Sequence, residues 1–204
     1  MSEGMNISKQ GLKTYDRNTT CEVCLESKQT RLPFNTERSR GQRPLEIIHT
    51  DLCGPVDPIT HDGNKYFITF IDDFTNFTMV YLLKGKNDVF DVIKQYTAEV
   101  EAKWNLKIHK FRCDNGGEYI LKEFRDWCKF KGIVLDYTVP YSPQLNGKAE
   151  RMNRTLLEKT RALLFDSQLN KEMWGEAIRT AAYLINRSPC ESVEKTLSEK
   201  WNGQ

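Results

Sequence analysis

Three acidic residues are placed where they could together hold a divalent metal ion for phosphoryl transfer. Asp51 lies late in an apolar, β-branched segment, Asp114 follows a second such segment, and Glu150 lies near the start of a segment with helical periodicity. Phosphoryl transfer needs the reacting oxygens and phosphorus held in line while the developing charge is neutralised. Hard divalent cations prefer carboxylate oxygens, so three acids that converge from different elements would suffice for such a site.

The position of Glu150 on its expected helix follows from a rotation of about 100° per residue. The apolar side chains of this segment cluster on one side, and Glu150 lies well away from them, on the same face as Arg154 and Arg161. Arginines beside a metal-holding carboxylate could bind phosphate groups. Glu150 and Arg154 could equally form a surface ion pair, which stabilises a helix by only about 0.2–0.5 kcal/mol. An aspartate at a strand end also often only forms a turn, so spacing alone leaves these interpretations open.

Basic residues are concentrated in the segment that contains Glu150, although the net charge of the whole chain is only +2. Such a cluster is typical of a nucleic-acid-binding surface and equally of an ordinary solvated face. Composition therefore does not decide between the two. The basic residues of this segment are Lys148, Arg151, Arg154, Lys159 and Arg161.

Apolar and alternating segments predict the elements that would position these residues. The predicted order is strand, strand, strand, helix, strand, helix, strand, helix, helix. This order indicates an α/β fold, with a mixed five-stranded sheet and helices on both faces. In the helix expected at residues 120–131, Leu121, Phe124 and Cys128 share the face that should be buried. The expected strands are residues 45–52, 66–72, 78–83, 107–113 and 133–139, and the expected helices are residues 88–104, 120–131, 147–165 and 171–185.

Size and composition indicate one globular domain with a tail. The 204-residue chain is 39% hydrophobic and 28% charged, and it is long enough to bury a core. No apolar segment approaches the roughly 18–20 residues that a membrane span needs. The polar segment from Met1 to Arg17 also lacks the apolar block of a secretory signal. We therefore expect no membrane partner, and we expect the six cysteines to be reduced thiols.

Five sequence blocks, in this order along the chain, resemble copia-type retrotransposon integrases of the retroviral integrase superfamily. Thirty-five residues separate Asp114 from Glu150, which is the spacing of the D,D-E signature of these enzymes. The resemblance covers about residues 20–204 and implies a ribonuclease-H-like fold, in agreement with the predicted order of elements. The blocks are HTDLCGP (49–55), YFITFIDDFT (66–75), DNGGEY (114–119), YSPQLNGKAERMNRT (141–155) and WGEAIRTAAYLINRSP (174–189).

The resemblance implies that Asp51, Asp114 and Glu150 are the catalytic triad and bind Mg²⁺, or Mn²⁺ in its place. The implied activity is that of a DNA integrase, which processes the 3′ ends of element DNA and joins them to host DNA. Its partners would be double-stranded DNA, as element ends and as target, and further copies of the chain in a homo-oligomer. It would act in the nucleus after a cytoplasmic stage. The residues expected to contact DNA are Gln144, Asn146, Lys148, Arg151, Arg154 and Arg161.

Two other functions remain open. A host-retained or decayed copy would bind DNA or protein partners without catalysis, and an intact triad argues only against complete decay. A true ribonuclease H on the same fold would cut the RNA of hybrids. Such an enzyme would need a fourth carboxylate, and it lacks the 35-residue spacing that separates Asp114 from Glu150 in this chain. The loop at residues 140–147 is also open to two interpretations. Gln144 and Asn146 would contact DNA if it is the active-site loop, whereas in a plain connection Asn146 would only cap the helix.

The expected domain organisation has three parts. Residues 1–43 form a flexible lead-in with the remnant of an N-terminal zinc-binding domain, residues 44–188 form the integrase catalytic core, and residues 189–204 form a truncated C-terminal extension. Cys21 and Cys24 supply two of the four ligands that a closed zinc site needs. The resemblance implies a histidine pair upstream of them, but the first histidine of the chain is His49. Zn²⁺ binding by a single chain is therefore not expected.

Overall fold

The computed structural model describes residues 40–137, 147–189 and 195–203, which all belong to one compact unit, Arg38–Gln204. The expected zinc ligands Cys21 and Cys24 lie outside the described residues, as do the expected DNA contacts Gln144 and Asn146. The structure does not bear on these four residues, and their roles stay predictions.

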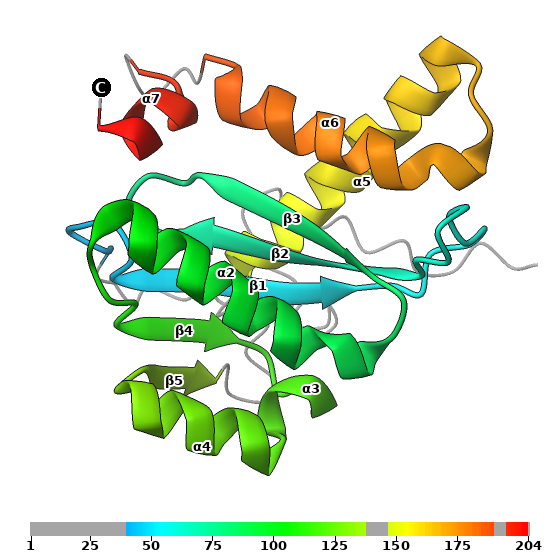
Figure 1. Cartoon of the computed structure of the whole chain (residues 1–204). Coiled ribbons are helices and arrows are strands. Elements are labelled where there is room, and N and C mark those ends of the chain that lie inside the picture. Colours follow the sequence, from blue (N-terminus) through cyan, green and yellow to red (C-terminus); the bar gives the residue numbers. More distant parts are fainter. Residues whose placement is uncertain (1–39, 138–146, 190–194, 204) are drawn as a thin grey trace, which may run out of the picture. The chain divides into compact units, whose positions relative to one another are not determined.

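A mixed five-stranded sheet forms the centre of this unit, as the sequence predicts (Figure 1). Its strands are β1 (Ile47–Cys53), β2 (Tyr66–Asp72), β3 (Thr78–Leu83), β4 (Lys110–Cys113) and β5 (Val134–Tyr137). They lie side by side in the order β3-β2-β1-β4-β5. The first three form an antiparallel meander, because they are joined by loops alone, whereas β4 and β5 follow helices and run parallel to β1.

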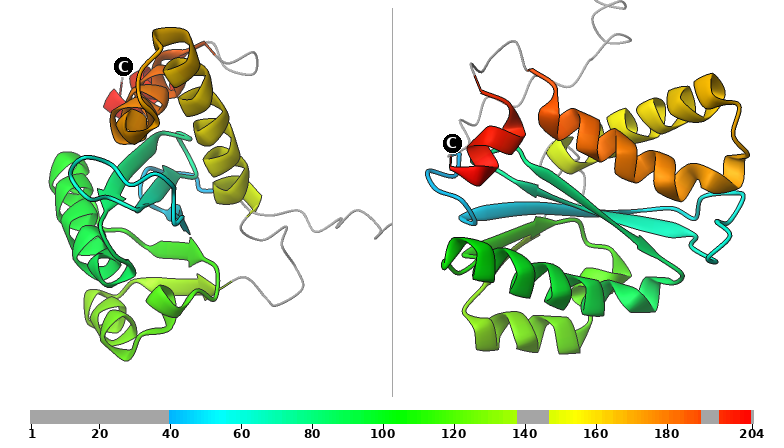
Figure 2. Two further views of the ribbon diagram at one scale, coloured as in Figure 1. Left: turned by 90° about the vertical axis from the view of Figure 1, so that its right-hand side faces the viewer. Right: turned by 45° about the horizontal axis from the view of Figure 1, so that its top comes forward.

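Helices cover both faces of this sheet (Figure 2). They are α2 (Val89–Trp104), α3 (Gly117–Ile120), α4 (Lys122–Lys131), α5 (Gly147–Ser167), α6 (Trp174–Arg187) and α7 (Leu197–Asn202). Side chains alternate along β2, so that Ile68 and Phe70 lie in the core that α2 and α4 cover. Phe67 points to the other face and packs with Leu156 of α5 and Ile178 of α6. The predicted order of strands and long helices is confirmed.

The single helix expected at residues 120–131 is in fact two helices. α3 ends at Ile120, and Leu121 has an extended conformation (φ −55°, ψ 135°) before α4 begins. The expectation that Leu121 is buried is therefore wrong: it is 52% exposed, whereas Tyr119 and Phe124 are fully buried. The break at Leu121 separates the two helices, so that Tyr119 of α3 and Phe124 of α4 can each reach the core.

Helix α7 lies in the stretch expected to be a C-terminal extension, and it packs against the sheet-containing unit. Trp201 is only 4% exposed and stacks on Phe77, with the ring centroids 4.9 Å apart. At the start of the helix the Thr196 hydroxyl accepts a hydrogen bond from the Glu199 backbone N–H, and the Glu199 carboxylate accepts one from that of Thr196. Part of this stretch therefore contributes to the core.

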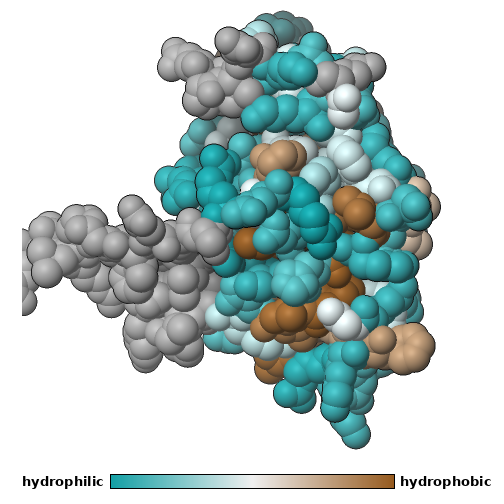
Figure 3. Space-filling view, turned by 90° about the vertical axis from the view of Figure 1, so that its left-hand side faces the viewer, coloured by the Kyte–Doolittle hydropathy of each residue, from teal (hydrophilic) through white to brown (hydrophobic). Residues whose placement is uncertain are grey.

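The side of the molecule at which β1, β4 and β5 begin is mostly hydrophilic, and apolar residues show there in a few separate groups (Figure 3). No helix in the described ranges is long and apolar enough to cross a membrane. Two of the residues predicted to be catalytic, Asp51 and Asp114, lie toward the opposite, carboxyl ends of β1 and β4.

Candidate active site

Asp51 and Asp114 lie close together because β1 and β4 are parallel neighbours. The register pairs His49 of β1 with Arg112 of β4. Continued two residues further, the same register brings Asp51 level with Asp114, which directly follows β4. Adjacent strands lie only about 4.8 Å apart, so two acids at this level strongly influence each other's ionisation.

The carboxyl group of Asp51 lies between β1 and α5. Asn153 of α5 donates a hydrogen bond from Nδ2 to Asp51 Oδ2 at 2.9 Å. Burial, together with the negative charges of Asp114 and Glu150, raises the pKa of Asp51 to about 7, although the hydrogen bond from Asn153 acts in the opposite direction. A carboxyl group that resists ionisation because of acidic neighbours would ionise readily beside a bound cation.

The turn from β4 into α3 fixes the position of Asp114. Asp114 Oδ1 accepts a hydrogen bond from the backbone N–H of Gly116 at 2.9 Å. A Cβ atom at Gly116 would lie 2.9 Å from Asp114 Oδ1 and 2.6 Å from Glu118 Oε1, so a larger residue here would displace the two carboxylate groups. Tyr119 anchors the helix that follows, since its hydroxyl lies 3.1 Å from Thr50 Oγ1 of β1.

Glu150 lies on the exposed side of α5, as its helical position predicts. Arg151, Arg154 and Arg161 are exposed on the same helix. Within the described ranges Glu150 and Arg154 form no ion pair, so the surface pair that the spacing allows is not present. The charge of Glu150 instead contributes to the raised pKa of Asp51, which places the two carboxyl groups in one electrostatic environment.

A buried charged network ties the first turn of α5 to the sheet. Asp73 is 6% exposed and accepts hydrogen bonds from Lys148 Nζ at 2.6 Å and from the backbone N–H of Gly41 at 2.8 Å. Its other contact is His49 Nε2 at 2.9 Å, which must donate because a carboxylate can only accept. Burial alone would raise the pKa of Asp73, but these hydrogen bonds hold it well below its usual range. Because Lys148 precedes Glu150 by two residues, the network fixes the start of the helix that carries the third acid.

The position of Lys148 differs from that of the other expected DNA contacts. Its side chain is only 24% exposed, and its ammonium group is engaged by Asp73. Burial lowers the pKa of Lys148, whereas the hydrogen bond to Asp73 raises it. This geometry favours a structural role, and DNA contact by Lys148 stays a prediction.

The three predicted metal ligands are brought near one another but do not converge on one point. Among the side chains that the structure describes, no group of three His, Cys, Asp or Glu residues is close enough to hold a metal ion as it stands. The donors nevertheless fit a hard divalent cation, because all are carboxylate oxygens and the repulsion that raises the pKa of Asp51 would be offset by a positive ion. Asp51, Asp114 and Glu150 are therefore the residues that could hold Mg²⁺ or Mn²⁺.

The thiols next to the two aspartates are poor nucleophiles. Burial raises the pKa of Cys53 to about 11, with a further contribution from the charge of Asp51, and burial also raises the pKa of Cys113. Since the thiolate is the reactive form, both side chains stay protonated and inert. Both are free cysteines, in agreement with the expectation of reduced thiols.

Three residues that support the site were not found from the sequence. Asn153 is 4% exposed and lies on the buried side of α5 with Ala149 and Leu156. A polar residue within an otherwise apolar helix face can be recognised in a sequence, and it would have marked Asn153 as a candidate site residue. Asp73 carries no such local signal, because its partners come from distant parts of the chain. Glu118 is a fourth acid near Asp114, and its charge also contributes to the raised pKa of Asp51.

Comparison with known proteins gives a family and relatives. The integrase core domain family matches residues 41–143, about half of the chain. The chain is 47% identical to the retrovirus-related Pol polyprotein from transposon TNT 1-94 of Nicotiana tabacum over 194 residues, which are 93% of this chain and 15% of that polyprotein. It is 32% identical to the retrovirus-related Pol polyprotein from transposon RE1 of Arabidopsis thaliana over 185 residues, which are 90% of this chain and 12% of that polyprotein. The chain therefore spans a small part of the length of these relatives.

Solved structures share the fold. An intasome of simian T-cell lymphotropic virus in complex with PP2A regulatory subunit B56 gamma aligns with a TM-score of 0.69 and 19% identity, over 89% of this chain and 63% of that chain. The HTLV-2 integrase catalytic core domain in complex with magnesium, in its trimeric form, aligns with a TM-score of 0.60 and 18% identity, over 78% of this chain and 98% of that chain. The mixed sheet is thus the predicted ribonuclease-H-like fold. The family match and the identities to the two Pol polyproteins show that the chain belongs to the integrase core domain family, as the catalytic core of a copia-type retrotransposon integrase.

Proposed function

We propose that this domain is a metal-dependent polynucleotidyl transferase that processes the 3′ ends of element DNA and joins them to host DNA. The observation that carries the proposal is the placement of three acidic residues on β1, at the end of β4 and in the first turn of α5, where the charges of Asp114 and Glu150 both act on Asp51. In a member of the integrase core family, this placement supports phosphoryl transfer assisted by divalent metal.

The residues of the chain would bind and orient the reacting groups. Asp51, Asp114 and Glu150 would hold Mg²⁺ or Mn²⁺. The metal would supply activation of the attacking water in end processing and of the freed 3′-hydroxyl group in strand transfer, and it would neutralise the charge that develops at phosphorus. Asn153 orients the carboxyl group of Asp51, and the backbone N–H of Gly116 orients that of Asp114. Two of the three acids thus have fixed positions before any substrate binds.

A strand-transfer assay on duplexes that carry the ends of the parent element tests this function. With Mg²⁺ or Mn²⁺ we expect shortened 3′ ends and products joined to a second duplex. A host-retained or decayed domain would bind the duplexes and form neither product. A ribonuclease H would cut the RNA of an RNA–DNA hybrid, and Glu118, as a fourth acid near Asp114, is a specific reason to include that substrate. Cleavage of the hybrid without strand transfer would contradict the proposal.

We also propose double-stranded DNA and further copies of the chain as its partners, with the nucleus as its site of action after a cytoplasmic stage. The HTLV-2 integrase catalytic core has been solved in trimeric and dimeric forms, and the simian virus structure is an intasome. These descriptions support an oligomer that acts on DNA.

Mg²⁺ should raise the melting temperature of the metal-free protein, and it should do so more at about pH 8 than at about pH 5.5. The folded-state pKa of Asp51 is about 7, above the ordinary value of 3.8. Protonated Asp51 is therefore favoured in the folded state. Its contribution to the free energy of unfolding is fully present below pH 3.8 and is lost as the pH rises from 3.8 through 7. A cation would stabilise the ionised carboxylates at high pH, whereas protons compete with it at low pH. Thermal unfolding with and without millimolar Mg²⁺ measures both shifts.

The control is the double variant Asp51→Asn, Asp114→Asn, which should show no shift with Mg²⁺ because two of the three charged ligands are gone. An equal shift in the variant and the parent would mean that Mg²⁺ binds elsewhere.

Replacing Arg154 and Arg161 together by alanine should weaken DNA binding about equally for all sequences, because interactions with phosphates carry no base readout. The slope of log K against log salt should flatten by about 0.9 for each phosphate that the variant no longer neutralises. Titrations of a labelled duplex at several salt concentrations measure this slope. A matched control replaces Arg125 of α4 and Arg179 of α6, which are also exposed. If both pairs change the slope equally, Arg154 and Arg161 are ordinary surface residues.

A further inference from the structure

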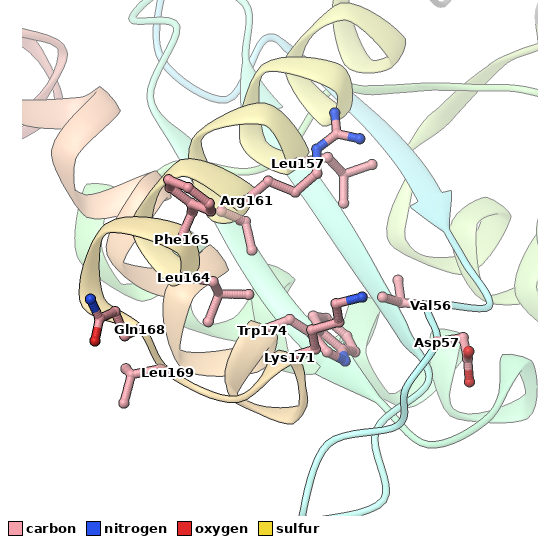
Figure 4. A pocket seen from close by; sticks show the side chains of 11 residues that line it. Val56, Asp57, Leu157, Arg161, Leu164, Phe165, Gln168, Leu169, Lys171 and Trp174 are labelled. Atoms are coloured by element: carbon pink, nitrogen blue, oxygen red, sulfur yellow. The ribbon is translucent and has the colours of Figure 1, made fainter.

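A cleft of about 660 Å³ lies beside the turn between α5 and α6 (Figure 4). Its wall comes from four parts of the chain: the loop after β1, the second half of α5, the connection between α5 and α6, and the start of α6. Trp174 lies at its centre, between Leu164 of α5 and Val56 of the loop (Figure 4). A cleft of this volume and apolar character is typical of a site that takes up an apolar side chain or small ligand.

Thr160 provides an unused polar group in this cleft. Thr160 lines the cleft and is only 3% exposed, and its Oγ1 has no hydrogen-bond partner among the described residues. Buried hydroxyl groups are nearly always hydrogen-bonded, because an unpaired one loses its water without compensation. The wall of the cleft therefore contains one buried hydroxyl group whose hydrogen-bonding requirement is not met by the described residues.

Two large apolar side chains extend the surface beyond the cleft. Phe165 is 89% exposed and Leu169 is 53% exposed, and both contribute to the lining. Exposed apolar side chains next to an apolar cleft are typical of a surface that another protein covers. A small molecule that filled only the cleft would leave Phe165 in water, whereas a protein segment would cover it as well.

The charges around the cleft indicate the sign of this partner. Arg161 and Lys171 contribute two exposed cationic side chains, against one exposed acid, Asp57. We propose that the cleft is a docking site for a segment of a partner protein that inserts an aromatic or long aliphatic side chain and carries Asp or Glu beside it. The apolar wall complements the inserted side chain, and the two cations complement the neighbouring acids.

Selection of random displayed peptides on the full chain tests the proposal. We expect the recovered peptides to combine aromatic or aliphatic residues with Asp or Glu. Phe165→Ser should weaken the binding of a synthetic copy of a recovered peptide about tenfold or more, because it removes the large exposed aromatic side chain from the docking surface. The matched control is Phe130→Ser on α4, where the phenylalanine is 88% exposed but is not part of the cleft lining, and it should leave the affinity unchanged.

Two further variants separate the contributions of charge and of the buried hydroxyl. Lys171→Glu should lower the affinity for the same peptide, whereas Lys84→Glu, also at an exposed lysine, should not. Thr160→Val should raise the melting temperature of the free protein by about 2–4 °C, since an unsatisfied hydroxyl is removed. The proposal is overturned if no peptide is recovered, if the peptides are rich in Lys and Arg, or if Phe165→Ser and Phe130→Ser have equal effects.

Discussion

Asp51→Asn, Asp114→Asn and Glu150→Gln are each expected to reduce 3′-end processing and strand transfer by about 100-fold or more. Each change keeps the size of the side chain but removes one negative charge from the predicted metal site. The loss of activity follows because the site would then hold the cation less tightly and in a different position, while several kcal/mol of charge stabilisation depend on it. Product formation on labelled duplexes, with Mg²⁺ and with Mn²⁺, measures the effect.

The same variants should leave the fold intact, and Asp51→Asn should even stabilise the metal-free protein at about pH 8. At that pH the partly buried Asp51, with its pKa of about 7, is forced to ionise beside Asp114 and Glu150, and asparagine removes this cost. Asp62→Asn, at an exposed acid in the loop after β1, is the matched control and should retain activity. Activity within tenfold of the parent in any one triad variant, a change of only about 1.4 kcal/mol in the barrier, would remove that residue from the catalytic set.

Asp73→Asn is expected to destabilise the protein by about 2–4 kcal/mol at neutral pH. The carboxylate accepts three hydrogen bonds in a nearly dry environment, and the amide would leave the partly buried Lys148 without its counter-charge. Because the folded-state pKa of Asp73 lies below its ordinary value of 3.8, its contribution is present above about pH 4 and is lost as the pH falls further. Urea unfolding of the variant and the parent, at neutral pH and near pH 3, measures the difference in their free energies of unfolding at each pH. We expect this difference to be smaller near pH 3.

Asp91→Asn is the control for this substitution. Asp91 also pairs with a lysine, Lys94, at 2.6 Å, but it is 78% exposed on α2. Exposed pairs of this kind contribute little, so its removal should change the free energy of unfolding by less than about 0.5 kcal/mol. Equal effects of the two substitutions would show that the network around Asp73 does not hold α5 to the sheet.

Much of the fold could be predicted because its strands and long helices carry local patterns. The apolar residues of β2 fill both faces of the sheet, and the stripe along α2 includes Ile93, Tyr96 and Val100, which are all buried. Such periodicities depend only on neighbouring residues, so one sequence is enough to detect them. The break at Leu121 could not be detected in this way, because Leu121 is apolar and fits a helical stripe that the backbone does not follow.

The site itself could be predicted only in part. The sequence predicts that Asp51 and Asp114 lie at the ends of two strands, but the parallel pairing of β1 and β4, which brings them level, is seen only in the structure. The contacts of Asp73 and Asn153 join residues 75 and 102 positions apart, respectively, and no local pattern specifies such pairs. They depend on how α5 packs on the sheet, which is determined by the whole core.

The pairing of β1 with β4 also bears on how copies of such an element lose competence over time. Successive side chains of a strand point to opposite faces, so one residue inserted between His49 and Asp51 would turn the acid away from α5. A genomic copy with one extra codon there would keep an open reading frame, all three acids and the apolar pattern of its sheet, yet it could not assemble the site. Extra codons in the loop at residues 54–65, between β1 and β2, would leave the pairing unchanged. A census of copies that counts intact acidic signatures would therefore overestimate how many can still move.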